Sequence, residues 1–240
     1  TLAWAAEFHD AVQNAAPDSL TVGEVWSSNF TASQYVPEAA DLVFEFDLAT
    51  AMVQSARGGR ANAILSLQER TYGLYPPNQY AAFLTNHDQN RVMNELRSVE
   101  KAKLAATLLL TQPGVPFIYY GEEIGMQGAK PDERIRTPMQ WDGSDEYGGF
   151  STGAPWQPFQ NDLDTVSVAA QTDDAESLLN HYRTMLRLRN EHPALMHGDY
   201  LPVESESRQV YAFLRRAADE TLLVVINLSD EATSDYALSL

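Results

Sequence analysis

The first apolar positions of the chain recur at helical spacing over residues 3–16, and Pro17-Asp18 ends this pattern before a short extended run at 20–23. Further extended runs follow at 42–46, 80–84 and 116–120. Helical segments are predicted between them, over about 61–70 and 98–110. Because strand and helix signals alternate, the pattern predicts parallel βα units.

The periodicity then disappears over residues 121–173, where Gly, Pro, Trp, Asn and Asp dominate. A loop of this length in a compact domain is usually functional. The capping-box spacing Asp173-x-x-Glu176 predicts the start of an amphipathic helix that ends near Pro193.

The tail of the chain has a different pattern. Residues 209–215 alternate between apolar and polar, and residues 221–228 form an apolar run. With the short polar link between them, these runs predict a β-hairpin in a separate small β-domain.

Composition narrows the class of protein. With 240 residues, 44% of them hydrophobic and 20% charged, the chain is long enough to bury a sizeable core, so we expect a folded protein. The net charge is −17, and the few basic residues are scattered, which disfavours nucleic acid and anionic membranes as partners. No apolar stretch approaches the roughly 20 residues that span a bilayer.

The residue types available as metal ligands and nucleophiles also limit the kinds of site that the chain can form. The absence of Cys excludes disulfides, thiolate zinc sites and thiol nucleophiles. The five His residues include no pair at zinc-ligand spacing, so we predict no metal site in this chain.

Three polar clusters follow strand signals, at residues 22–26, 83–91 and 119–126. The carboxyl ends of strands are where functional groups converge in a barrel of βα units. Two of the clusters place carboxylates, Glu24 and Asp88, near aromatic residues such as Trp26. Paired carboxylates beside aromatic faces meet the requirements of glycosidic bond cleavage.

Each cluster also has a structural interpretation. A carboxylate at a strand end is commonly solvated or ion-paired, as Glu24 would then be, and His87 with Asp88 would form a satisfied polar pair. Glu122 and Glu123 are typical of a turn cap, and the Trp residues of the long loop are typical of packing anchors.

The amino-acid sequences of the clusters are more informative than the spacing between them. Gly-Glu-Val-Trp lies at 23–26, Phe-Leu-Thr-Asn-His-Asp-Gln-Asn-Arg at 83–91, Gly-Val-Pro-Phe-Ile-Tyr-Tyr-Gly-Glu-Glu at 114–123, and Arg-Thr-Pro-Met-Gln-Trp at 136–141. In this order they closely resemble the α-amylase family of glycoside hydrolases, over essentially the whole chain.

The resemblance implies an α/β fold, the second half (strands 5–8) of a (β/α)8 TIM barrel followed by part of a small antiparallel β-domain. We expect residues 1–195 to form the partial catalytic barrel and residues 196–240 the partial β-domain.

The resemblance also implies roles for individual residues. Glu24 corresponds to the general acid/base, and its pKa should be raised by partial burial and a neighbouring carboxylate. Asp88 corresponds to the auxiliary carboxylate that grips the sugar at the cleavage site, His87 bonds the same ring, and Trp26 contacts sugar.

One element of the family pattern is missing. The family's nucleophile is an Asp in an Arg-x-Asp motif upstream of the general acid, and Glu7, Asp10 and Asp18 lack that context. Retaining hydrolysis needs a second carboxylate at about 5 Å from the acid. We therefore expect a fragment of a retaining α-glucan hydrolase, inactive alone because its nucleophile lies before Thr1.

The expected substrate is an α-1,4-glucan or maltooligosaccharide. An α-glucosidase or a trehalose synthase-like transglycosylase is the alternative within the family, and a non-catalytic glucan-binding module is the alternative from another class. The chemistry requires no cofactor, and the resemblance is compatible with structural calcium in the parent chain. A half barrel with two open edges is expected to self-associate.

Overall fold

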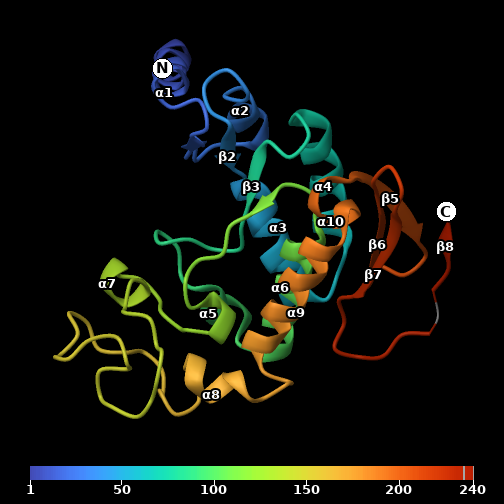
Figure 1. Cartoon of the computed structure of the whole chain (residues 1–240). Coiled ribbons are helices and arrows are strands. Elements are labelled where there is room, and N and C mark those ends of the chain that lie inside the picture. Colours follow the sequence, from blue (N-terminus) through green and yellow to red (C-terminus); the bar gives the residue numbers. More distant parts are fainter. Residues whose placement is uncertain (235, 240) are drawn as a thin grey trace. The chain divides into compact units, whose positions relative to one another are not determined.

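The computed structural model describes residues 1–234 and 236–239 (Figure 1). Within these residues, no helix has both the length and the apolar character needed to cross a membrane. The chain divides into two compact units. The first unit contains residues 1–83, 112–117 and 192–240, and the second contains residues 84–111 and 118–191.

A parallel sheet in the first unit carries the strand ends that the sequence singled out. Its strands are β1 (Val22–Gly23), β2 (Leu42–Phe44), β3 (Tyr80–Ala82) and β4 (Val115–Pro116). They pair in the order β1-β2-β3-β4, and every pairing is parallel. The predicted βα pattern is thus confirmed, and the carboxyl ends of all four strands lie along one edge of the sheet.

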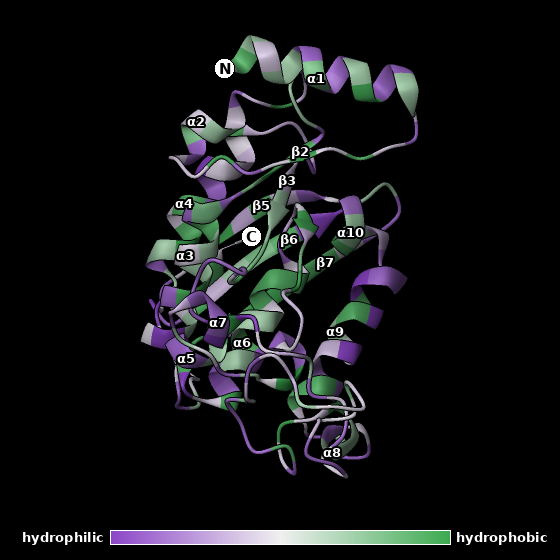
Figure 2. Ribbon diagram, turned by 90° about the vertical axis from the view of Figure 1, so that its left-hand side faces the viewer, coloured by the Kyte–Doolittle hydropathy of each residue, from purple (hydrophilic) through white to green (hydrophobic). Residues whose placement is uncertain are grey.

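Helices follow the strands as the alternation predicts. The first unit contains α1 (Leu2–Ala15), α2 (Asn29–Ser33), α3 (Phe46–Gly58) and α4 (Asn62–Leu74). The strand predicted over 42–46 is wrong beyond Phe44, because Glu45 caps α3 by accepting a hydrogen bond from the Leu48 backbone N–H. Polar and apolar segments alternate along α1 in Figure 2, and its Trp4 and Phe8 are exposed.

An antiparallel sheet completes the first unit, after the short helix α10 (Pro193–His197). Its strands are β5 (Asp199–Ser205), β6 (Val210–Arg216), β7 (Thr221–Asn227) and β8 (Leu238–Ser239), in the order β7-β6-β5-β8. The β6–β7 hairpin confirms the prediction from the tail. β5 was not predicted, because Pro202 interrupts its pattern.

The second unit is built around two helices that pack together, α6 (Val99–Thr111) and α9 (Leu178–Glu191). It also contains α5 (Val92–Leu96) and, inside the stretch predicted as a loop, η1 (Glu122–Ile124), α7 (Asp132–Ile135) and α8 (Val168–Thr172). The predicted cap at Asp173 is wrong. Asp173 ends α8, and the Ser177 hydroxyl caps α9 by accepting a hydrogen bond from the Asn180 backbone N–H at 3.2 Å.

Candidate active site

Glu24 follows β1 directly, at the edge of the sheet where the parallel strands end. Its side chain is exposed, so the partial burial expected for it is not present in this chain. Gly23 precedes it, and a Cβ at that position would lie 3.1 Å from Cγ1 of Val43 on the neighbouring strand. The close approach of β1 and β2 therefore favours glycine beside this carboxylate.

Trp26, two residues further on, presents an exposed indole. Its ring stacks on Phe46 with 4.7 Å between centroids and 17° between planes. The indole is thus held from one side by an aromatic ring while it remains accessible, and an accessible, fixed aromatic face suits the apolar face of a sugar.

A row of aromatic rings continues from Trp26 along the edge of the sheet. Phe46 meets Phe83 edge-on at 5.1 Å, Phe83 meets Phe44 at 5.3 Å, and Phe44 meets Phe117 at 5.0 Å. Phe44 ends β2, and Phe83 and Phe117 directly follow β3 and β4. The ends of β2, β3 and β4 are therefore joined by packing of aromatic rings.

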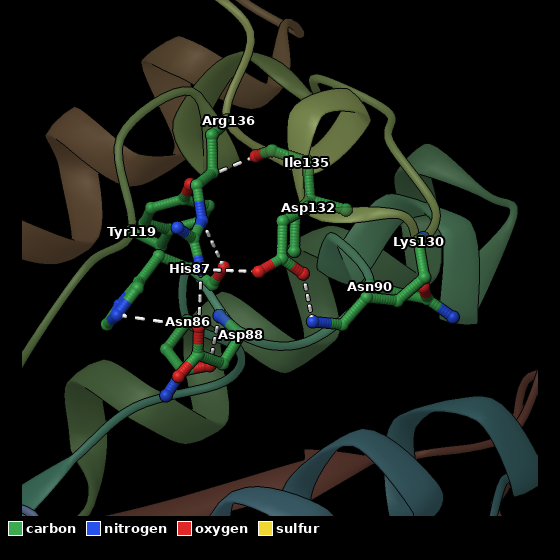
Figure 3. A network of polar contacts seen from close by, with 9 residues as sticks. All are labelled: Asn86, His87, Asp88, Asn90, Tyr119, Lys130, Asp132, Ile135 and Arg136. Atoms are coloured by element: carbon green, nitrogen blue, oxygen red, sulfur yellow. Dashed lines mark hydrogen bonds and ion pairs between the residues drawn. The ribbon is translucent and has the colours of Figure 1, made fainter.

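Asp88 and His87 lie in the second unit, within a polar network (Figure 3). Asp88 Oδ1 accepts a hydrogen bond from Nη2 of Arg136 at 2.5 Å, and His87 Nε2 lies 3.6 Å from the same oxygen. Nε of Arg136 donates to the His87 carbonyl at 2.9 Å. Arg136 thereby fixes both the side chain of Asp88 and the backbone beside it.

The network extends from Arg136 to α7. Nη2 of Arg136 donates to Asp132 Oδ2 at 2.9 Å, and Asp132 is also paired with Lys130. The hydrogen bond from Lys130, with the positive charge of Arg136 nearby, lowers the pKa of Asp132. The Lys130 backbone N–H donates to Asn90 Oδ1 at 2.8 Å. This bond connects the network to Asn90, two residues after Asp88.

A second arginine, Arg91, holds the two tyrosines Tyr119 and Tyr120. The Arg91 guanidinium lies 4.6 Å from the Tyr119 ring centroid and 4.7 Å from that of Tyr120, and its Nη1 donates to the Tyr120 carbonyl at 2.6 Å. Tyr120 in turn donates to the Thr137 carbonyl at 2.6 Å. Within the second unit, Arg91, Tyr120 and Thr137, which come from three different motifs, are therefore linked by hydrogen bonds.

Glu122 is the most buried carboxyl group of these motifs. It accepts a hydrogen bond from the Tyr182 hydroxyl at 2.7 Å, and it is 3% exposed. Burial, reinforced by the nearby Glu123, raises the pKa of Glu122 to about 8. Its position at the start of η1, bonded to α9, agrees with the structural interpretation of this pair.

The structure thus places the four candidate residues in two groups. Glu24 and Trp26 lie together after β1, and His87 and Asp88 lie together in the second unit with Arg136. Sequence reasoning gave Arg136 no role, although it begins the Arg-Thr-Pro-Met-Gln-Trp motif. Among the described residues, no three His, Asp or Glu side chains group as a metal site would require.

Residues 1–198 match the family model described as the α-amylase catalytic domain. The chain belongs to the α-amylase family. It is 34% identical over 235 residues to "Alpha-amylase 3" of Dictyoglomus thermophilum, covering 94% of this chain and 46% of that protein. It is 32% identical over 209 residues to an "Oligo-1,6-glucosidase" of Halalkalibacterium halodurans, covering 70% of this chain and 37% of that protein.

The fold agrees with this membership. The crystal structure of an α-amylase from H. orenii superposes with a TM-score of 0.84 at 35% identity, covering 95% of this chain and 47% of that one. The chain therefore spans about half the length of these α-amylase relatives. The expected fold, half of an α-amylase (β/α)8 barrel followed by antiparallel β-structure, is confirmed.

Proposed function

We propose that this chain supplies the general acid/base and the auxiliary carboxylate of a retaining α-glucan hydrolase that cleaves α-1,4-glucosidic bonds. The observation that carries the proposal is the position of Glu24, an exposed carboxyl group at the carboxyl end of a parallel strand, two residues before a stacked and accessible Trp26. Family membership supplies the reaction class.

In the proposed reaction, the Glu24 carboxyl group donates its proton to the glycosidic oxygen as the bond to the anomeric carbon breaks. A carboxylate nucleophile forms a bond to that carbon. Glu24, now ionised, then takes a proton from water, whose oxygen displaces the nucleophile and releases the sugar with its original configuration.

Asp88 and His87 are proposed to hold the sugar ring at the cleavage point. Arg136 supports this role, because its guanidinium fixes one oxygen of Asp88 and the backbone carbonyl of His87. The second Asp88 oxygen and the half-exposed His87 ring are then available to sugar hydroxyls. Trp26 is proposed to stack on a sugar face.

We further propose that the nucleophile comes from outside these 240 residues, which contain no Arg-x-Asp sequence. The isolated chain is then expected to be catalytically inactive. Activity is expected once the family's amino-terminal half, for example that of the Dictyoglomus relative, is joined before Thr1. We refer to this protein as the joined enzyme.

An exo-acting α-glucosidase is the second candidate. The observation that favours it is the 32% identity to a protein named as an oligo-1,6-glucosidase. The two candidates differ in their first products from maltoheptaose, because an endo-acting hydrolase cleaves internal bonds to give mixed maltooligosaccharides, whereas an exo-acting glucosidase gives glucose and maltohexaose.

The test is the product profile of the joined enzyme on maltoheptaose. Mixed maltooligosaccharides are expected, with turnover reduced at least about 100-fold in Glu24→Gln and in Asp88→Asn. The exposed Glu7→Gln variant, on α1, is the control and should retain wild-type turnover. First products limited to glucose and maltohexaose would favour the exo-acting candidate, and undiminished activity in Glu24→Gln would refute the role of Glu24.

A further inference from the structure

The segment that carries Glu24 is gripped by three consecutive residues of a different element, and this inference rests on the proposed function of Glu24. The segment runs from Glu24 to the start of α2 at Asn29. The gripping residues are Glu45, Phe46 and Asp47, at the junction between β2 and α3. All of them lie in the first unit.

Phe46 and Asp47 contact the segment directly. The Phe46 ring lies under the Trp26 indole at 4.7 Å. Asp47 Oδ2 accepts a hydrogen bond from the Asn29 backbone N–H at 2.9 Å. The segment is therefore held at its middle by apolar stacking and at its end by a charge-assisted hydrogen bond.

Glu45 acts on the same end of the segment through Tyr75, the residue that follows α4. The Tyr75 hydroxyl lies 2.6 Å from Glu45 Oε2 and 3.3 Å from the Asn29 carbonyl oxygen. Glu45 is 1% exposed and Tyr75 is 5% exposed, so water does not compete for these bonds. Asn29 is thus bonded to Asp47 through its N–H, and its carbonyl oxygen lies within hydrogen-bonding distance of the Tyr75 hydroxyl.

We propose that Glu45, Asp47 and Tyr75 are positioning residues that hold the Glu24 segment in the orientation needed to protonate the glycosidic oxygen. None of the three is required to touch substrate. A displacement of about 1 Å in a catalytic group can cost about 100-fold in rate, so contacts at the far end of this six-residue segment can change the rate.

The protonation of Glu45 sets the direction of the Tyr75 hydrogen bond. Burial raises the pKa of Glu45, the bond from Tyr75 opposes this shift, and the charge of Asp47 adds to it. When Glu45 is ionised, the Tyr75 hydroxyl donates its hydrogen bond to the Glu45 carboxylate. A protonated Glu45 donates to the Tyr75 oxygen and leaves the Tyr75 proton free for the Asn29 carbonyl.

The test compares Tyr75→Phe in the joined enzyme on two substrates. Maltoheptaose has a poor leaving group that needs the proton of Glu24, whereas α-maltosyl fluoride loses fluoride with little acid assistance. With maltoheptaose we expect kcat to fall about tenfold and KM to stay within about twofold. With the fluoride we expect kcat to stay within about twofold.

Two matched variants separate positioning from general damage. Tyr72→Phe removes a hydroxyl from the last turn of α4, three residues before Tyr75, and should leave both rates unchanged; this hydroxyl bonds Asp199 at 3.0 Å. Glu45→Gln keeps the shape and one acceptor oxygen and should retain at least about a third of the wild-type kcat on maltoheptaose. Equal losses on both substrates in Tyr75→Phe, or no loss, would overturn the proposed positioning role.

Amide hydrogen exchange of the 240-residue chain gives a readout that does not depend on turnover. Tyr75→Phe should accelerate exchange at residues 24–33 relative to both the wild type and Tyr72→Phe. If exchange is accelerated in Tyr75→Phe but the wild-type joined enzyme cleaves neither substrate, the positioning contacts are supported and the proposed function is rejected. Unchanged exchange would overturn the positioning role whatever the activity.

Discussion

The carboxyl groups of this chain differ in how far they are buried. Glu24 is exposed after β1, whereas Glu122 is fully enclosed beside Tyr182 and carries a pKa raised to about 8. The difference fits their proposed roles, because a group that must reach substrate has to be accessible. The enclosed Glu122 instead links η1 to α9.

Glu122 should make stability depend on pH. Its folded pKa of about 8 exceeds the value of about 4.3 for an unfolded Glu, so the folded protein keeps a proton that the unfolded chain releases. The stabilisation is fully present below pH of about 4.3 and is lost as the pH rises through about 8. Glu122→Gln cannot lose this proton.

We therefore expect the free energy of unfolding of the wild type to fall, relative to Glu122→Gln, by more than about 1.4 kcal/mol between pH 5 and pH 8. Urea unfolding followed by circular dichroism at both pH values measures it. Glu176→Gln, at an exposed position, should follow the wild type. Parallel pH dependence of wild type and Glu122→Gln would contradict the assignment of the buried proton.

At the scale of elements, the sequence predicts most strands and long helices but misplaces their ends. The run 42–46 resembles one strand because every residue in it except Glu45 is apolar, yet Glu45 caps a helix. The helix α3 was not predicted, although Asp47, Thr50, Gln54 and Arg57 recur along it at helical spacing, because the strand predicted over 42–46 includes its first residue, Phe46. The positioning residues proposed above depend on this junction between β2 and α3.

The start of α9 shows the same difficulty and offers a test. Asp173-x-x-Glu176 fits a capping box, but the cap is Ser177, whose hydroxyl accepts from Asn180 and donates to the Gln171 carbonyl at 2.8 Å. Ser177→Ala should lose about 1 kcal/mol of unfolding free energy. Asp173→Ala should stay within about 0.5 kcal/mol of the wild type. Urea unfolding curves compare the two, and the reverse order would restore the capping box.

For the whole molecule, the motifs gave the family and the fold, and membership and fold are confirmed by comparison with known proteins. The residues that hold the motifs in place were less accessible to sequence reasoning. Arg136 bonds Asp88 from 48 positions along the chain, and Tyr75 bonds Glu45 from 30 positions away. Such pairings follow from the path of the chain and leave no periodic signal.

The central claim is that Glu24 is the general acid/base of a retaining glucan hydrolase, and azide rescue of Glu24→Ala in the joined enzyme tests it most directly. Fluoride leaves α-maltosyl fluoride without acid assistance, and azide attacks the covalent intermediate without base assistance. We expect azide to accelerate consumption of the fluoride and to give α-maltosyl azide, with retained configuration. A β-configured product, or no acceleration by azide, would contradict the claim.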